Sequence, residues 1–262
     1  MYLRSIHAEK DILTLYKFIQ ANPLGLLMTA IESESFPFLQ SSHIPWVLDV
    51  PKGDNESDFG SLRGHMARAN PQAKALTNYC KSALGENPNT EDEEHRTLQR
   101  DVLVMFHGPV HHYITPKFYA ETKPMTGKVV PTWNYSAVQV YGRATIYYEP
   151  KAISTHEFLN RQVKDLTHHT EVNLLGFKEK PWVIEDAPES YIEILKKAII
   201  GIEIKITDIG GKWKMSQEMP AGDQEGVARG FERMEGDVAE EMAATVRERC
   251  AMKENKKGVL EQ

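Results

Sequence analysis

The sequence predicts an α+β domain built on an antiparallel sheet or barrel. Short apolar or alternating runs recur along the first 210 residues, and Pro, Gly, Asp or Asn separate them, as expected for strands joined by turns. Segments with helical spacing lie at the ends of these runs, without the regular strand–helix alternation of a parallel sheet. A chain of 262 residues buries roughly 70–75% of its unfolded surface, so a core forms without disulfides.

The first half of the chain is predicted to contain two helices and three strands. Apolar residues from Ile12 to Ile19 follow the spacing of one helical face, and Asn22-Pro23 cannot continue it, which predicts a helix over 8–21. Asn70-Pro71 is typical of an N-cap followed by the first helical residue, so a second helix begins there. The predicted strands cover residues 24–31, 42–50 and 60–66.

The second half adds strands and ends in a charged helix. The acidic stretch 85–95 lacks apolar periodicity and is predicted to be a solvated loop. A capping box at 186–189 is predicted to open a helix that contains Ile192 and Leu195. The strands are predicted over residues 102–106, 110–115, 137–148 and 201–209, and further helices over 151–166 and 235–253.

Charge and cysteine content limit the possible partners and location. The chain has 37 acidic and 31 basic residues and a formal net charge of -6, so it has no global attraction to nucleic acid. Cys80 and Cys250 are too few for a disulfide scaffold and favour a reducing compartment. Because neither a transmembrane segment nor a secretory apolar region is present, we expect a cytoplasmic protein.

Several common catalytic motifs are absent. The chain has no Gly-x-Gly-x-x-Gly, and its two Gly-Lys pairs are followed by Val and Trp, which excludes the Rossmann and P-loop fingerprints. It also lacks His-Glu-x-x-His and Gly-x-Ser-x-Gly. The adjacent His111 and His112 would point to opposite faces of a strand, so we expect no metal site.

The segment from Leu62 to Pro71 carries the clearest candidate site. It places Arg63, His65 and Arg68 before a helix whose first N–H groups lack intrahelical partners, and such a junction suits an anion such as phosphate. An ordinary strand-to-helix junction with solvated arginines explains the same residues about equally well.

Two further clusters are open to more than one interpretation. Val130–Tyr135 gathers aromatic and amide groups that would line an aromatic ligand. From the residues alone, the better-supported interpretation is that these side chains pack into the end of a barrel. Gly211–Gln217 has two lysines beside an indole, a pattern that is also typical of an exposed sheet edge.

Taken together, these segments resemble the PaiB-type FMN-binding proteins, often labelled FMN-binding negative transcriptional regulators. Nine blocks occur in register across residues 1 to about 230. They are Met1-Tyr2, Asn22–Gly25, Ser42–Pro45, Gly64–Pro71, Val130–Tyr135, Pro181-Trp182, Asp186–Pro188, Ile199–Glu203 and Gly211–Gln217.

The resemblance implies an FMN-binding split β-barrel, antiparallel and similar to the pyridoxamine phosphate oxidases, with flanking helices. It also implies a homodimer with FMN at the subunit interface. The barrel domain would cover residues 1–230, with the acidic loop 85–95 as an insertion, and residues 231–262 would form a charged helical tail.

The resemblance also implies a set of flavin contacts. His65, Arg68 and Asn70 would face the phosphate and ribityl chain, with Met66 in the same block and Arg63 as a neighbour. Ser42, His43 and Ile44 would run beside the isoalloxazine. The pocket would be closed by Thr132, Trp133 and Asn134, and Lys214, Ser216 and Gln217 would reach the flavin or the partner subunit.

Two classes of function are compatible with these features. The first is an FMN-dependent oxidoreductase that acts on a small molecule with a donor such as NAD(P)H, with His43 or His65 as candidate proton relays. The second is a flavin-binding negative transcriptional regulator without catalysis. Because the chain is acidic and has no clear helix-turn-helix, we do not expect direct DNA binding. A third use of the pocket would be another aromatic ligand, such as haem.

Overall fold

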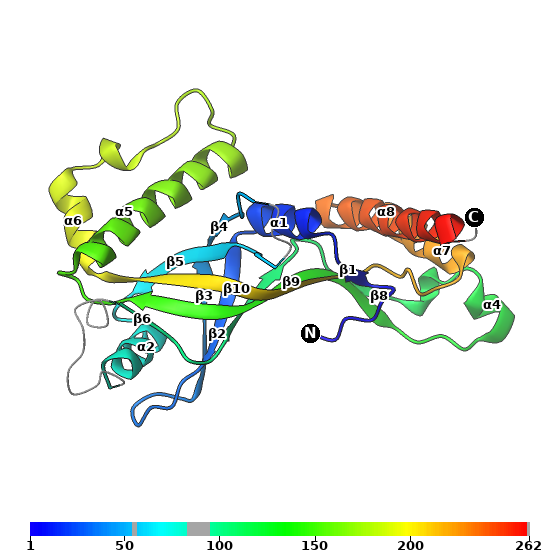
Figure 1. Ribbon diagram of the computed structural model, residues 1–262. Helices are drawn as coiled ribbons and strands as arrows, with labels where there is room; N and C mark the ends of the chain where they lie inside the picture. Colours follow the sequence, from blue (N-terminus) through cyan, green and yellow to red (C-terminus); the bar gives the residue numbers. More distant parts are fainter. Residues whose placement is uncertain (54–56, 83–94, 261–262) are drawn as a thin grey trace. The chain divides into compact units, whose positions relative to one another are not determined.

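The computed structural model describes residues 1–53, 57–82 and 95–260, with side chains up to residue 252. These residues form two compact units. We call residues 16–106 and 139–209 the sheet unit, and residues 1–15, 107–138 and 210–262 the terminal unit. The two longest strands, β9 (Thr132–Tyr147) and β10 (Ile199–Lys214), contribute residues to both (Figure 1).

The sheet unit is an antiparallel sheet that curls on itself. The strand order is β3-β2-β7-β9-β10-β5-β4, and β3 pairs with β2, β2 with β7, and β5 with both β10 and β4, all antiparallel. Although β3 and β5 are far apart in this order, they contact each other, so the sheet closes partly into a barrel. The strands are β2 (Leu24–Ala30), β3 (Leu39–Pro45), β4 (Val47–Asp49), β5 (Ser61–Ala67), β6 (His95–Thr97) and β7 (Val102–His107).

Trp46 fills the interior of this curled sheet, with 1% of its surface exposed. Two glycines make room for its indole. A Cβ added at Gly64 would lie 2.9 Å from the indole, and one at Gly25 would lie 2.8 Å from it and 2.7 Å from both Val104 and Phe106. The glycines therefore let β2 and β5 approach the ring more closely than any other residue would allow.

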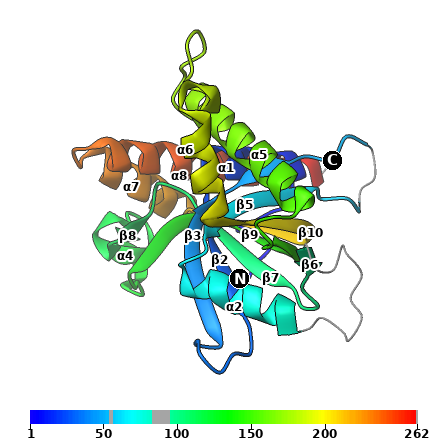
Figure 2. The same cartoon turned by 90° about the vertical axis from the view of Figure 1, so that its left-hand side faces the viewer.

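Helices cover both faces of the sheet unit. Figures 1 and 2 show α2 (Pro71–Ser82) on one face and α5 (Ile153–His168) on the other. Phe158 of α5 lies flat against Gly201 of β10, where an added Cβ would meet the ring at 2.4 Å. Tyr147 stacks on the same ring at 4.2 Å between centroids. The chain continues through η2 (His169–Leu174), η3 (Ile184–Asp186) and α6 (Glu189–Lys197).

The terminal unit gathers three separate stretches of chain. Arg249 of α8 joins the first and the last of them: it forms an ion pair with Glu9 at 2.7 Å and lies 4.2 Å above the ring of Trp213. In α7, Gly226 and Gly230 rest directly against Phe118. The elements are β1 (Ala8–Glu9), β8 (His112–Ile114), η1 (Pro116–Phe118), α4 (Thr122–Thr126), α7 (Ala221–Glu232) and α8 (Asp237–Leu260), together with the start of α1 (Ile12–Ala21).

The predicted α+β class, with an antiparallel split barrel and flanking helices, is confirmed, and so is the helix near the C-terminus. The helix predicted over 8–21 begins later, because Ala8 and Glu9 pair with β10 and the carboxylate of Asp11 accepts the Thr14 amide at 2.8 Å. Residues 83–94 lie outside the described part, so the predicted acidic loop is not tested there. The boundary at residue 231 also stays a prediction.

Two further expectations about local structure are wrong. Residues 132–134 belong to β9 and pair with β8, so the strand predicted over 137–148 begins earlier, at Thr132. The carboxylate of Asp186 accepts the Val183 amide at 3.1 Å and caps η3, while α6 starts after Pro188 without a side-chain cap. Both errors arose because residues 132–134 and the short 3-10 helix carry no periodic signal of their own.

Within the described ranges, no helix combines the length and the apolar character that a membrane span requires.

Candidate functional site

The predicted flavin contacts fall into a group in each unit. The sheet unit holds Ser42, His43, Ile44, Arg63, His65, Met66, Arg68 and Asn70, and the terminal unit holds Thr132, Trp133, Asn134, Lys214, Ser216 and Gln217. Each group is built from different elements, so we treat them in turn.

Strand β3 presents Ser42 and His43 to different sides. Ile44 is buried at 5% exposure, and Ser42 shares its face because side chains alternate along a strand. His43 lies on the opposite, exposed face. The hydroxyl of Ser42 accepts a hydrogen bond from Nδ2 of Asn70 at 2.9 Å. The structure thus brings two of the predicted contacts from β3 and α2 together.

Asn70 also caps α2. Its Oδ1 accepts the amide of Gln72 at 2.8 Å, as the predicted N-cap requires. This bond uses one of the N–H groups at the start of α2 that were predicted to be free to bind an anion. An anion at this junction therefore depends mainly on side-chain donors.

The guanidinium of Arg63 binds two carboxylates of the sheet unit. Its Nε and Nη2 donate to Asp49 of β4 at 2.5 and 2.8 Å, and Nη2 also donates to Asp165 of α5 at 2.7 Å. Burial alone would lower the pKa of this guanidinium, but the two carboxylates raise it above its ordinary value. Arg63 therefore joins β4, β5 and α5, and we leave it out of the proposed phosphate contacts.

His65 shares the α5-facing side of β5 with Arg63, whereas Met66 points into the barrel and is 4% exposed. Burial lowers the pKa of His65, so its imidazole is neutral at physiological pH. Its Nδ1 is buried without a hydrogen-bond partner. His65 is therefore a half-buried neutral imidazole with an unsatisfied ring nitrogen.

Arg68 has the free donor that an anion site requires. Its Nε donates to the carbonyl of Lys197 at 2.9 Å and its Nη1 to that of Tyr148, while Nη2 is buried without a partner. Burial lowers the pKa of Arg68, and the charge of Glu149 opposes this effect. No carboxylate forms an ion pair with it in the described part of the chain. A half-buried cation with an unused donor, two residues from Asn70, fits the phosphate of FMN.

The terminal unit exposes an aromatic platform beside a buried polar turn. Trp133 is 49% exposed and forms an edge-to-face pair with its cross-strand neighbour Tyr113, with ring centroids 6.3 Å apart. His111 also stacks on Trp133, with ring centroids 6.0 Å apart. Exposed rings of this kind can stack on a flat aromatic ligand.

The predicted residues after β10 form a closed turn. Nδ2 of Asn134 donates to the hydroxyl of Ser216 at 3.0 Å, and both residues are almost fully buried. Gln217 accepts the Met215 amide at 2.6 Å and donates to the Trp213 carbonyl at 2.7 Å. Ser216 has a left-handed φ of 65°. The hydrogen bonds of Gln217 within the turn, and that from Asn134 of β9 to Ser216, hold the turn in this strained conformation.

A charged network that the sequence did not indicate holds Lys214. Its ammonium donates to Thr132 Oγ1 at 2.7 Å and lies 3.4 Å from Glu218, and the second carboxylate oxygen of Glu218 accepts from His7 Nε2 at 2.9 Å. The Lys214–Glu218 spacing of four residues is the only part visible in the sequence. His7 is distant in the chain, and only the fold places it here.

This network predicts an acid-sensitive contribution to stability. Burial raises the pKa of Glu218, but the hydrogen bond from His7, a backbone amide and the charge of Lys214 together place it below the ordinary 4.5. A depressed pKa stabilises the folded state above the unfolded value, and that stabilisation is lost as the pH falls through the folded pKa. We expect Glu218→Gln to cost about 1.5 kcal/mol near pH 7, with a smaller difference below pH 4.5.

Urea unfolding of both proteins as a function of pH measures this effect. A cost for Glu218→Gln that does not change between neutral and acid pH would mean that the charge of Glu218 does not stabilise the fold.

Among the residues that the structure describes, no three His, Cys, Asp or Glu side chains lie close enough together to hold a metal ion.

Comparison with known proteins finds a family match and several relatives of this chain. Residues 1–208 match the family described as "Putative FMN-binding domain". An uncharacterized protein of Aspergillus fumigatus is 52% identical over 98% of this chain and 100% of its own length. The "Protease synthase and sporulation protein PAI 2" of Bacillus subtilis is 27% identical over 92% of each chain.

Solved structures give more distant matches. The flavocytochrome Anf3 from Azotobacter vinelandii is 15% identical, with a TM-score of 0.41 over 81% of this chain and 72% of its own. A pyridoxamine 5'-phosphate oxidase-related, FMN binding protein from Nostoc punctiforme is 11% identical, with a TM-score of 0.36 over 80% and 86%.

The family match covers most of the chain and includes the block from Gly64 to Pro71, with Arg68 and Asn70. The expected resemblance is thereby confirmed, and FMN is the cofactor that this membership assigns. The chain belongs to the PaiB-type FMN-binding family.

Proposed function

We propose that this protein is an FMN-dependent oxidoreductase that acts on a small molecule. The observation that carries the proposal is Arg68, whose buried Nη2 has no partner and which lies in a chain of the FMN-binding family. Arg68 would hold the phosphate, and the hydrogen-bonded pair of Ser42 and Asn70 would bind the ribityl chain.

Bound FMN supplies hydride or electron transfer, and the protein's part is to bind, orient and shield it. His65 is one candidate proton relay, because its Nδ1 has no hydrogen-bond partner, and burial lowers its pKa and favours the neutral imidazole. The exposed His43 is the second candidate for this role. The Trp133 platform would stack on an aromatic ring.

A homodimer forms part of the proposal. The PaiB-type resemblance implies FMN at a subunit interface, where Lys214 and the Trp133 platform would serve either the flavin or the partner subunit. Sedimentation equilibrium of the full chain, with and without FMN, tests this assembly, and a monomer under both conditions would contradict it.

The activity is tested by absorption spectroscopy with added FMN, followed by anaerobic titration with NADPH. Flavin bands that bleach, and that return with an electron acceptor, are expected. Bound flavin that neither NADH nor NADPH bleaches would favour a flavin-binding regulator. Failure to bind FMN would leave the fold available for another aromatic ligand, such as haem.

Arg68→Ala is expected to weaken FMN binding by about 10- to 100-fold, because a hydrogen bond to a charged group contributes about 1.5–3 kcal/mol. Titration of the apoprotein with FMN, followed by flavin fluorescence, measures the dissociation constant. Arg143→Ala is the control, since this arginine is 47% exposed and pairs with Asp101. Equal affinity for Arg68→Ala and the wild type would remove Arg68 from the phosphate site.

A further inference from the structure

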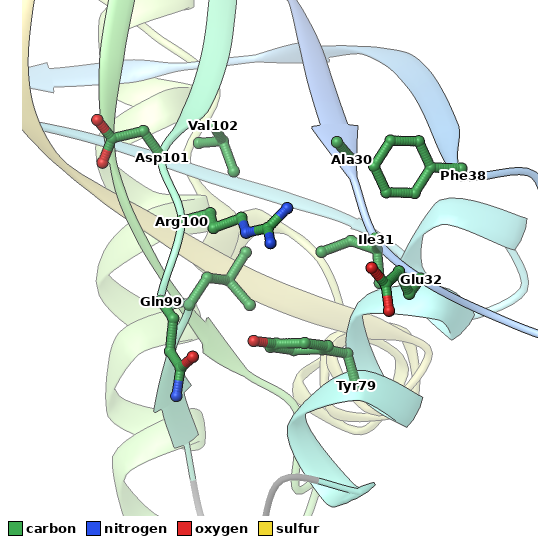
Figure 3. A pocket seen from close by; sticks show the side chains of 10 residues that line it. Ala30, Ile31, Glu32, Phe38, Tyr79, Gln99, Arg100, Asp101 and Val102 are labelled. Atoms are coloured by element: carbon green, nitrogen blue, oxygen red, sulfur yellow. The ribbon is translucent and has the colours of Figure 1, made fainter.

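A cavity in the sheet unit lies apart from all of the predicted flavin contacts. It has a volume of about 210 Å³ and opens between the end of β2, helix α2 and the segment that joins β6 to β7 (Figure 3). Ile31, Leu98 and Val102, each 7% exposed or less, form an apolar floor. The ring of Tyr79 from α2 closes one side.

Two opposite charges line this cavity without neutralising each other. Arg100 and Glu32 extend toward the same space in Figure 3. Neither forms an ion pair with the other, or with any other residue in the described ranges. Asp101 is the third charged residue of the lining, and it pairs with Arg143 at 2.7 Å. The cavity therefore offers one unpaired cation and one unpaired anion above an apolar floor.

This arrangement selects for a particular class of ligand. A simple anion would be attracted by Arg100 and repelled by Glu32, and a simple cation would meet the reverse. A molecule with both charges satisfies both groups, because a guanidinium binds a carboxylate through paired hydrogen bonds and a carboxylate accepts from an ammonium. The volume is below the roughly 300–1,000 Å³ of pockets for drug-sized ligands, so the occupant is small.

We propose that this cavity binds a small zwitterion of the amino-acid type. Arg100 holds its carboxylate, Glu32 holds its ammonium group, and its apolar side chain rests on Ile31, Leu98 and Val102. The site does not depend on FMN, so a failure of the proposed flavin chemistry would leave it unaffected.

Isothermal titration calorimetry with three molecules of matched shape tests the proposal on the full-length protein. L-leucine carries both charges, 4-methylpentanoate lacks the ammonium group, and 3-methylbutylamine lacks the carboxylate. We expect leucine to bind at least about ten-fold more tightly than either analogue, a difference of about 1.4 kcal/mol. Equal binding of leucine and 4-methylpentanoate, or no binding of leucine at millimolar concentration, would overturn the proposal.

Two variants assign the charges. Arg100→Gln should weaken leucine binding about ten-fold or more and leave 3-methylbutylamine unchanged or bound more tightly. Glu32→Gln should weaken leucine binding and leave 4-methylpentanoate unchanged or bound more tightly. Lys74→Gln and Glu34→Gln are matched controls, because both residues are exposed in the same unit and lie outside the cavity lining. Leucine binding that responds equally to all four substitutions would show a general charge effect and contradict the assigned roles.

Discussion

Arg63→Ala should lower the free energy of unfolding by about 3 kcal/mol, the lower end of the range for breaking a buried ion pair. The guanidinium is 1% exposed and holds Asp49 and Asp165, which are themselves 29% and 42% exposed. Its removal leaves two neighbouring carboxylates with only the exposed Arg161 as a shared cation. Water reaches both carboxylates in part, which limits the cost. Urea unfolding followed by circular dichroism measures it.

Arg161→Ala is the matched control for this prediction. Arg161 contacts the same two carboxylates at 3.2 and 3.6 Å, but it is 61% exposed. Exposed ion pairs contribute about 1 kcal/mol or less, so the control should lose no more than that. If the two variants lose the same stability, burial is not what makes Arg63 important.

Trp46→Ala should cost about 3–5 kcal/mol, the usual loss for a buried aromatic residue that leaves a cavity. The indole is 1% exposed and lies against Gly25 and Gly64, neither of which has a side chain that can move into the space. Its Nε1 has no hydrogen-bond partner, so the loss comes from packing. Thermal and urea unfolding report the change.

Two other substitutions test whether the loss of stability comes from the buried volume of the Trp46 indole. Trp46→Phe keeps most of the apolar volume and loses no hydrogen bond, so it should cost clearly less than alanine. Trp182→Ala removes an indole that is 44% exposed and should change stability by only about 0.5 kcal/mol. A similar loss for Trp46→Ala and Trp182→Ala would mean that the barrel interior is not tightly packed.

The sequence predicted the fold well because its signals were local. Asn70-Pro71 marked the start of α2 through the cap that the structure contains, and the alternating isoleucines marked β10. The early start assigned to the first helix was wrong because the pairing of Ala8 and Glu9 with β10 depends on residues some 200 positions away. No local pattern carries that information.

The candidate site was predicted less completely, since a side chain's partners are set by tertiary contacts. Arg63 and Arg68 look alike in the sequence, yet carboxylates surround one and backbone carbonyls the other. Likewise, nothing adjacent to Lys214 in the sequence indicates His7, which reaches it through Glu218. The charge state and free donors of each arginine became visible only with these contacts.

The terminal unit has a consequence for how this protein can be divided or recombined. It is assembled from the start of the chain (residues 1–15), a middle stretch (107–138) and the last stretch (210–262). The family match ends at residue 208, inside β10. Cutting there would sever a strand and remove Trp213 and Arg249, whose contact ties the last helix to β10. No single cut separates a self-contained module, so we expect this protein to be inherited and exchanged between genes only as a whole.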